Sequence, residues 1–450
     1  MSQDVQSWRF PRMFWTGNAA ELCERAAYYG TFIALGLYLN RVVGLDDVQA
    51  GWVAAMFGSW IYLVPFFTGA LADRIGFRNA LMIAFALLTL GYGALGVFST
   101  MAPVGVGLAL IVLGGSIVKP VISGTVSKSS NEMNRARAFS IFYMVVNIGS
   151  FIGKTVVADI RIQMGVHKVP FFSAGASLLA LIIVALVYFP DREGAKEKTN
   201  NIREVLNGMW AAVSNLRFLS LILITAGFWA IQGQLYASMP KYVLRMAGEG
   251  YKPEWLANIN PFIVVVFVVM VTQLVRKWKP QNSILVAMMI IPLSAISMAA
   301  SAWFHGDVNI LGMSVHPIVL MMVIGIALQG IAECFLSPKW LEFASLQAPK
   351  GQEGTFLGFA HINTFVAWLF GFAFSGYLLK AYCPEPSTLD AATQAAHQLA
   401  LAGQGPMPEA YANAHYLWYA YIGVGVISLA ALLVFIAVTK KIDQGKAEVA

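Results

Sequence analysis

Apolar segments of about 20 residues recur along the chain, and short polar stretches separate them. Each segment is long enough to cross the hydrocarbon core of a bilayer, which is roughly 30 Å thick. The pattern predicts helices over residues 13–40, 50–72, 79–99, 103–126, 137–159 and 169–189, and then over 217–244, 257–275, 281–303, 315–338, 354–381 and 413–438. We therefore predict an all-α membrane protein with twelve transmembrane helices in two six-helix bundles, at residues 1–190 and 217–450, joined by a cytoplasmic linker at 191–216.

The composition supports a membrane protein. Of the 450 residues 58% are hydrophobic and only 12% are charged, whereas about 25% are charged in a soluble protein. The net charge of +7 comes from Lys and Arg that gather in alternate loops, so it indicates topology and not a nucleic-acid partner. It predicts a protein of the plasma (inner) membrane, surrounded by lipid, with both termini in the cytoplasm. The stretch from Cys383 to Tyr411 is then an outer loop with a short helix.

Glu21, Glu24 and Arg25 interrupt the first predicted helix, in which almost every other residue is apolar or aromatic. Their spacing of three and four places them on one helical face. Each charge costs at least about 2.5–3.5 kcal/mol at the centre of a bilayer, so this face must look at other helices or at a water-filled cavity. The cluster either fixes helix packing or forms a site for a proton or a substrate.

Isolated charges also stand in later helices. Lys119 lies roughly 10 Å of helix from the predicted inner end, so it either snorkels to that end or faces a cavity, where it suits a carboxylate. Glu333 either forms a structural pair at the cytoplasmic gate or takes an amino group or a proton. Together, Lys119 and Glu333 predict a clamp for a zwitterion. Lys154 and Asp159 lie near the outer end of their helix, where we expect snorkelling.

A loop motif lies between the second and third helices. It reads Gly69-Ala-Leu-Ala-Asp73-Arg74-Ile-Gly76-Phe-Arg78. Gly76 permits a tight turn, and Asp73 can cap a helix or pair with an arginine. The motif resembles the G-x-L-A-D-R-x-G-x-R loop of the major facilitator superfamily. The resemblance implies the fold of that superfamily and a gating role for the loop, which latches the two bundles in the outward-facing state.

The first helix also carries a longer motif. Glu21-Leu-Cys-Glu24-Arg25-Ala-Ala-Tyr28-Tyr29-Gly30 resembles the E-x-x-E-R-x-x-Y-Y-G signature of the proton-dependent oligopeptide transporters, which include plant nitrate and peptide carriers. Further stretches agree in the same order, at Tyr62 with Pro65, Lys119-Pro120, Phe142-Tyr143 with Asn147, Asn260-Pro261, and Glu333 with Ser337-Pro338.

The resemblance implies a proton-coupled symporter that imports small peptides by alternating access, with a peptide-like substrate and protons as its partners and a monomer as the working form. Lys119 would hold the peptide carboxylate and Glu333 its amino end. Glu21, Glu24 and Arg25, with Glu333, would couple transport to protons, because substrate binding that competes for Arg25 shifts carboxylate protonation. The remaining pocket residues would be Tyr28, Tyr29, Tyr62, Asn147, Gln232 and Asn260.

Two departures from the family keep a second function open. Phe32 stands where many members have a second arginine, and Gln232 stands where the peptide carriers often have an acid. Lys119 therefore loses its expected partner, which favours a carrier for another small anion or metabolite, such as nitrate or an amino-acid derivative. A third hypothesis is a receptor or assembly factor that does not transport. The chain shows no nucleophile–base set, metal spacing or phosphate loop, so we expect no enzyme activity, no cofactor and no metal.

Overall fold

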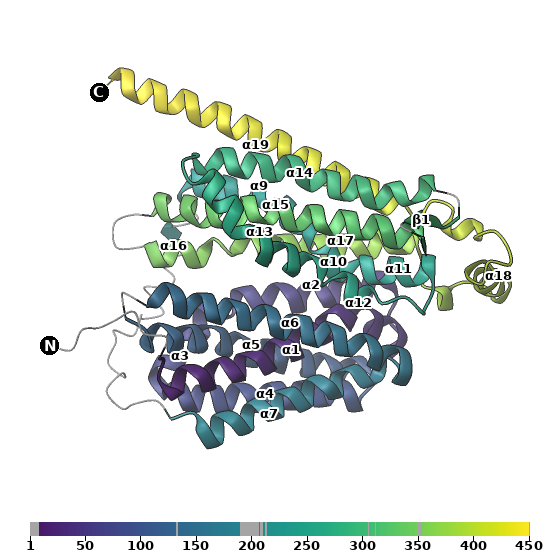
Figure 1. Cartoon of the computed structure of the whole chain (residues 1–450), viewed down its shortest axis with the longest axis horizontal. Coiled ribbons are helices and arrows are strands. Elements are labelled where there is room, and N and C mark those ends of the chain that lie inside the picture. The colour runs from purple at the N-terminus through teal and green to yellow at the C-terminus, as the bar shows by residue number, and fades with distance from the viewer. Residues whose placement is uncertain are drawn as a thin grey trace. The chain divides into compact units, whose positions relative to one another are not determined.

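The computed structural model describes residues 9–131, 134–189, 207, 210–211, 214–304, 306–310, 312–348 and 353–449. Contacts divide the chain into two compact units. Unit 1 comprises Met1–Val43 and Trp60–Val205, and unit 2 comprises Gly44–Ser59 and Leu206–Ala450. The helix α2 (Asp47–Leu63, labelled in Figure 1) therefore begins in the residues of unit 2 and ends in those of unit 1.

The described part of unit 1 is helical. Its elements are α1 (Arg12–Arg41), the end of α2 (Asp47–Leu63), α3 (Pro65–Ile75), α4 (Phe77–Val97), α5 (Met101–Lys128), α6 (Arg135–Met164), the 3₁₀ turn η1 (Val166–Lys168) and α7 (Val169–Val187). Helix α1 packs against α6 and α7, while α4 packs against α5 and α7. The charged segment of α1 thus lies against other helices of its own unit.

Unit 2 contains the remaining elements. They are α9 (Leu216–Gln232), α10 (Gln234–Ala237), α11 (Met239–Ala247), α12 (Pro253–Leu256), α13 (Ile259–Val275), α14 (Pro280–Ala300), η3 (Ser301–Trp303), β1 (Val308–Ile310), β2 (Met313–Val315), α15 (Pro317–Gln347), α16 (Glu353–Phe359), α17 (Ile362–Tyr382), η4 (Pro386–Thr388), α18 (Ala391–Leu401), η5 (Glu409–Tyr411) and α19 (Tyr416–Val449). The two short strands are antiparallel, with Val308 opposite Val315.

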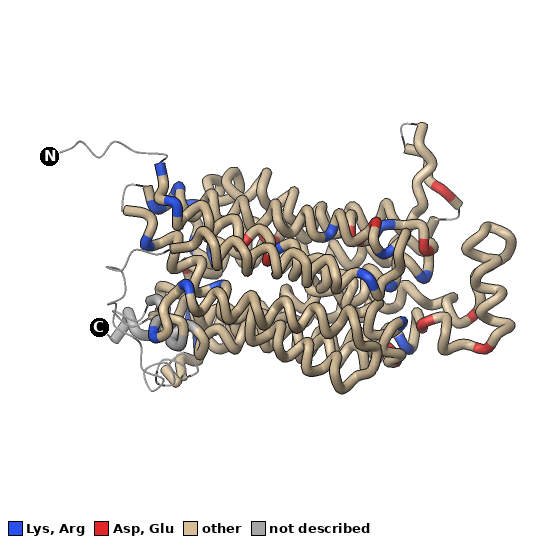
Figure 2. Tube along the Cα trace, turned by 90° about the horizontal axis from the view of Figure 1, so that it is seen from below, with Lys and Arg blue, Asp and Glu red and all other residues tan. Residues whose placement is uncertain are grey.

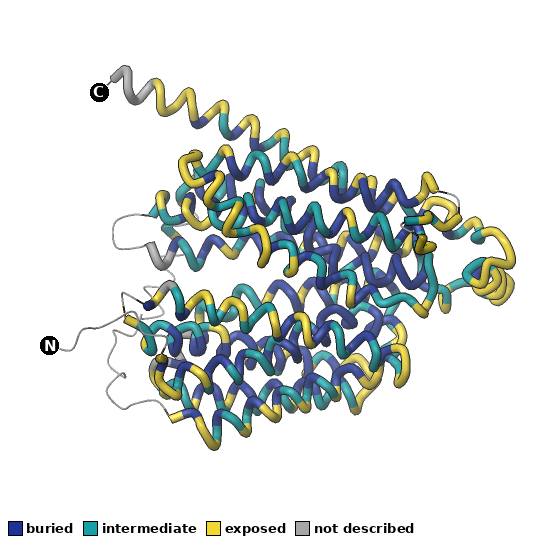
Figure 3. The backbone as a smooth tube through the Cα atoms, viewed as in Figure 1, coloured by how far each residue is buried: buried dark blue, intermediate teal, exposed yellow. Residues whose placement is uncertain are grey.

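Eleven helical stretches of the described residues are long and apolar enough to cross a bilayer. Helix α1, with 30 residues, adds a twelfth long helix, whose hydropathy is lowered by its three internal charges. Figure 2 shows that charged residues gather near helix ends, and Figure 3 shows that buried and exposed turns alternate along the helices. The predicted all-α membrane fold with twelve transmembrane helices is confirmed.

Three of the predicted helices are broken in the structure. The segment predicted over 50–72 divides into α2 and α3 just before Pro65, and that over 217–244 divides into α9, α10 and α11. Pro65 and Pro240 both stand in the first turn of a new helix, the position that tolerates a residue without a backbone N–H. The segment predicted over 354–381 divides into α16 and α17.

The predicted domain limits of 1–190, 191–216 and 217–450 stay a prediction, although the contacts assign Gly44–Ser59 to unit 2. Most of the predicted linker, residues 191–206, lies outside the described residues. The predicted short helix of the loop after α17 corresponds to α18, which Asp390 caps by accepting the backbone N–H of Thr393.

Candidate functional site

The acidic pair of α1 shares one guanidinium. Arg25 Nε donates to Glu24 Oε2 and also lies 3.2 Å from Glu21 Oε1. Both carboxylates are buried, with 1% of Glu21 and 2% of Glu24 exposed. Glu21 Oε2 has no hydrogen-bond partner within the described part of the chain. We call Glu21, Glu24 and Arg25 the motif cluster, and its two acids and one base leave a carboxylate incompletely paired.

The motif cluster adjoins two tyrosines that the sequence predicts to bind substrate. The Arg25 guanidinium lies 5.5 Å from the ring centre of Tyr28 and 6.0 Å from that of Tyr29, within the range of cation–π attraction. The ring of Phe32 stacks on that of Tyr28, with the ring centres 5.4 Å apart. Phe32 is 2% exposed, so the position of the family's second arginine holds a packing residue here.

Lys119 lies within α5, beside the internal Pro120, and its side chain is exposed. Its Nζ lies 5.6 Å from the ring centre of Tyr62, another predicted binding residue. Asn147 on α6 is half-buried and donates through Nδ2 to the Tyr143 carbonyl at 2.8 Å. Unit 1 thus places Lys119 beside Tyr62, and Arg25 beside Tyr28 and Tyr29.

The predicted residues of unit 2 converge on one carboxylate. Gln232, the last residue of α9, donates through Nε2 to Glu333 Oε2 at 2.8 Å. Asn260, near the start of α13, donates through Nδ2 to the same oxygen at 3.2 Å. Glu333 itself is half-buried on α15. Because both amides hold Oε2, the carboxylate is fixed in orientation and Oε1 is left to accept a further hydrogen bond.

The loop motif forms the turn between α3 and α4. Gly76 has a φ of 83° and separates the two helices, a conformation that favours glycine. Arg78 Nη2 donates to the Ala185 carbonyl at 2.7 Å, so it joins the start of α4 to the end of α7. Arg74 is exposed. Gly69 belongs to the backbone of α3, and the side chain of Asp73 lies outside the described part of the structure. The gating role stays a prediction.

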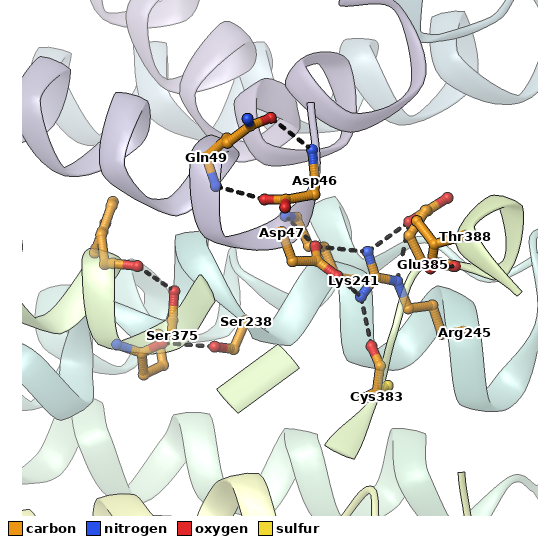
Figure 4. Close-up of polar contacts among 12 residues, drawn as sticks. Asp46, Asp47, Gln49, Ser238, Lys241, Arg245, Ser375, Cys383, Glu385 and Thr388 are labelled. Carbon is orange, nitrogen blue, oxygen red and sulfur yellow. Dashed lines mark hydrogen bonds and ion pairs between the residues drawn. The ribbon is translucent and has the colours of Figure 1, made fainter. Parts of the chain in front are cut away.

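Unit 2 holds a second buried set of charges, which the sequence did not predict. Arg245 on α11 donates through both Nη atoms to the two carboxylate oxygens of Asp47, each at 2.9 Å. Its Nε donates to Glu385 Oε2 at 3.0 Å, and Lys241 Nζ donates to Asp47 Oδ1 at 2.9 Å. Figure 4 shows Arg245 between Asp47 and Glu385. We call these four residues the Asp47 cluster, in which two acids balance two bases.

The surroundings of the Asp47 cluster are closed. Arg245 also donates to the Cys383 carbonyl, and its own carbonyl lies 2.6 Å from His397 Nε2 of α18. Burial raises the pKa of the Cys383 thiol to about 12, so this thiol is unreactive at neutral pH. Sequence patterns missed the cluster because Asp47 and Arg245 lie at helix ends, where a charge is read as a sign of topology.

Comparison with known proteins decides the superfamily. The sequence profile of the Major Facilitator Superfamily matches residues 19–315. The chain belongs to this superfamily. Its membership places this Major Facilitator Superfamily protein among membrane transporters and not among enzymes, as predicted. No group of His, Cys, Asp and Glu in the described residues could hold a metal ion.

Similar sequences point to peptide carriers. The chain is 32% identical over 167 residues to the di-/tripeptide transporter of Lactococcus lactis subsp. cremoris. The aligned segment covers 35% of this chain and 34% of the relative. It is 29% identical over 195 residues to solute carrier family 15 member 1 of Rattus norvegicus. This aligned segment covers 37% of this chain and 28% of the relative. The matched regions span only about a third of these relatives.

Solved structures share the fold along almost the whole chain. The peptide transporter POT in complex with sulfate has a TM-score of 0.71 at 22% identity and covers 96% of this chain and 95% of its own. A POT family transporter in complex with 5-aminolevulinic acid has a TM-score of 0.70 at 18% identity, with 96% and 97% covered. Together with the similar sequences, these structures confirm the predicted resemblance to the proton-dependent oligopeptide transporters.

Proposed function

We propose that this protein is a symporter of the plasma membrane, with both termini in the cytoplasm, which works as a monomer and imports small peptides or related zwitterions with protons by alternating access. The observation that carries the proposal is the carboxylate of Glu333. It lies in a transmembrane helix, and two neutral amides hold one of its oxygens. An ionised carboxylate at this position can form a charge-assisted hydrogen bond with an ammonium group, such as the amino end of a peptide. The names of the similar proteins support the same substrate class.

The proposed binding roles follow from the surroundings of each residue. Glu333 Oε1 accepts the substrate ammonium, while Gln232 and Asn260 keep the carboxylate in position. Lys119 binds the substrate carboxylate, and Tyr62 limits where its ammonium group lies. The remaining pocket residues would contact the peptide backbone and side chains, namely Tyr28, Tyr29 and Asn147.

The motif cluster is the proposed binding site of the coupled proton. Glu21 and Glu24 are both buried and have one guanidinium between them. Two ionised carboxylates that share one directly contacting guanidinium repel each other in a region of low dielectric, and a proton on one carboxylate removes this repulsion. A substrate or conformational change that moves Arg25 away from the carboxylates raises their affinity for a proton. Proton uptake and release can then follow the transport cycle.

Uptake into proteoliposomes tests the proposal. With an inside-negative potential and an acidic exterior, we expect labelled di-alanine to accumulate while the interior acidifies. Glu333→Gln and Glu24→Gln should each lower concentrative uptake at least about tenfold, because each loses a charge that is costly to bury unless it is used. Glu342→Gln on the same helix as Glu333 is the matched control, since Glu342 is largely exposed and pairs with Lys339. A folded protein that accumulates no di-alanine would overturn the peptide assignment.

A carrier for another small anion or metabolite is the second candidate. The neutral Gln232 and the exposed Lys119 favour it, because no ion pair within the described residues occupies the Lys119 ammonium. Competition for di-alanine uptake by nitrate and by an amino-acid derivative separates the candidates. Inhibition by nitrate that is lost in Lys119→Ala would favour the anion carrier, whereas inhibition by dipeptides alone supports the peptide carrier.

A further inference from the structure

Helix α15 begins at an unusual cap. His316 stands at the N-cap, and its ring atom Nδ1 accepts the backbone N–H of Ile318 at 3.3 Å. Its backbone carbonyl accepts the N–H of Leu320 at 3.1 Å. Side chains also cap α9, at Asn215, and α18, at Asp390. Asn and Asp are common N-cap residues and histidine is not, and of these three caps only His316 changes its charge between pH 5 and 7.

The cap requires a neutral imidazole. Because Nδ1 of His316 accepts a hydrogen bond, the ring proton is on Nε2. A second proton would turn Nδ1 into a donor that faces the Ile318 N–H. It would also put a positive charge at the positive end of a helix of 31 residues. Both effects oppose the cap, so protonation of His316 releases it.

The surroundings of His316 favour its neutral form. The ring is half-buried, and its centre lies 5.7 Å from that of Tyr251. Burial lowers the pKa of His316, and the charge of Asp307 opposes this shift without reversing it. Asp307 is exposed and accepts the Ser314 hydroxyl at 2.7 Å. Other charged residues on elements that contact α15 are Arg217 on α9, Lys241 and Arg245 on α11, Glu254 on α12 and Glu353 on α16.

The cap joins a hairpin to a helix. Strand β2 ends at Val315, directly before His316, so the cap fixes the β1–β2 hairpin on the start of α15. We propose that His316 is a pH-sensitive switch, which holds the hairpin and the first turn of α15 in place at neutral pH and releases them in acid. The stabilisation is present above the ordinary histidine pKa, near 6.5, and is lost as pH falls through the lower folded value.

The switch acts on the helix that carries Glu333. With both termini in the cytoplasm, as proposed above, His316 lies on the outer side of the membrane, where a proton-coupled importer meets acid. External acid then loosens the outer end of the helix that holds the proposed ammonium-binding carboxylate. This consequence rests on the proposed function, whereas release of the cap does not depend on which substrate is carried.

Hydrogen–deuterium exchange of the full chain in detergent, at pH 7.5 and 5.0, tests the switch. After correction for the intrinsic rate, the wild-type peptide that contains Ile318 and Leu320 should exchange about tenfold faster at pH 5.0, the effect of losing one helix cap. In His316→Asn, whose cap does not titrate, exchange should be slow and should agree within about twofold at the two pH values. In His316→Ala it should be fast at both.

Two controls separate the switch from general loosening in acid. The first turn of α18 should exchange equally at both pH values, because hydrogen bonds from Thr393 lower the pKa of its cap, Asp390. His415→Asn should keep the wild-type response, because His415 is also half-buried but stands before α19.

The inference is wrong if wild-type α15 exchanges equally at both pH values, or if His316→Asn responds to acid as the wild type does. Uptake of di-alanine tests the proposed function separately, so its absence would leave the exchange result unchanged.

Discussion

The two buried charge clusters differ in balance and in hydrogen bonding. In the motif cluster, two carboxylates share Arg25, and Glu21 Oε2 lacks a partner among the described residues. In the Asp47 cluster, two bases meet two acids, and Arg245 alone donates to two carboxylates and a carbonyl. Both clusters are buried, so burial does not distinguish them.

The difference teaches how to separate a structural cluster from one that changes state. A balanced and fully bonded set of charges has no reason to take up a proton, and removing one member leaves a buried charge without its partner. An unbalanced set has two protonation states close in energy, because a proton can neutralise the carboxylate that no basic side chain fully pairs with. We therefore assign stability to the Asp47 cluster and proton binding to the motif cluster.

The largest effect on stability should follow from Arg245→Met. It leaves Asp47 and Glu385 buried without their main partner, so we expect a loss of about 3–5 kcal/mol in the free energy of unfolding. Chemical denaturation in detergent, followed by tryptophan fluorescence, measures it. Arg217→Met is the control, because the Arg217–Asp443 pair is largely solvated and should contribute no more than about 1 kcal/mol. Equal effects of the two variants would contradict the assignment.

Glu24→Gln should have an intermediate effect. Arg25 donates to Glu24 through Nε, and its Nη2 forms an ion pair with the same carboxylate oxygen. A charge-assisted hydrogen bond contributes about 1.5–3 kcal/mol. We expect a loss of that size in the same denaturation assay. A variant as stable as the wild type would show that Arg25 depends on a different partner.

Glu21→Gln should cost less than about 1 kcal/mol in stability, because Glu21 Oε2 has no partner among the described residues and a neutral side chain fits a protonated carboxyl site. The same variant should alter coupling, so that uptake of di-alanine no longer rises with an imposed proton gradient. The measurement is uptake at external pH 5.5 and 7.5, with wild type beside the variant. A steep loss of stability would place the ionised carboxylate at Glu21 and not at Glu24.

The smallest effect should come from Asp46, which neighbours Asp47 but is exposed. Its Oδ1 accepts the backbone N–H of Gln49 at 2.8 Å, and Lys380 lies near Oδ2. These contacts lower the pKa of Asp46, chiefly through the Gln49 N–H. The stabilisation is therefore present above the unfolded-state pKa, near 3.8, and is lost as pH falls through the lower folded value.

Asp46→Asn tests that small contribution, because Asn caps a helix as well as Asp does and only the charge is removed. We expect a loss of at most about 1 kcal/mol at pH 6, which shrinks as the pH falls below the unfolded-state pKa near 3.8. The difference in Tm between variant and wild type, followed across this range, reports it. A difference that grows on acidification would reverse the sign and contradict the lowered pKa.

Sequence patterns predicted whatever depends on neighbours along the chain. The apolar segments gave the transmembrane helices, and the isolated charges of Glu24 and Glu333 stood out because a membrane helix rarely carries them. The pairing of Asp47 with Arg245 could not be predicted in the same way, since 198 residues separate them. Only 1% of Lys154 is exposed, so its expected snorkelling is wrong. The burial of Lys154 depends on the contact of Gly153 with α1, which the sequence of α6 alone does not contain. The strands β1 and β2 have three residues each, too few to show the alternation of apolar and polar residues that predicts a strand.

The division of α2 between the two units sets an order of events during synthesis. Asp47 leaves the ribosome 198 residues before Arg245, an interval of about 10–40 s at 5–20 residues per second. Until α11 and the segment around Glu385 have been made, the first turns of α2 have no ion partner from unit 2. The amino-terminal helices therefore cannot all complete their packing in the order of synthesis. The ion pairs of α2, an early helix, form only after residues near the carboxyl-terminal end have been synthesised.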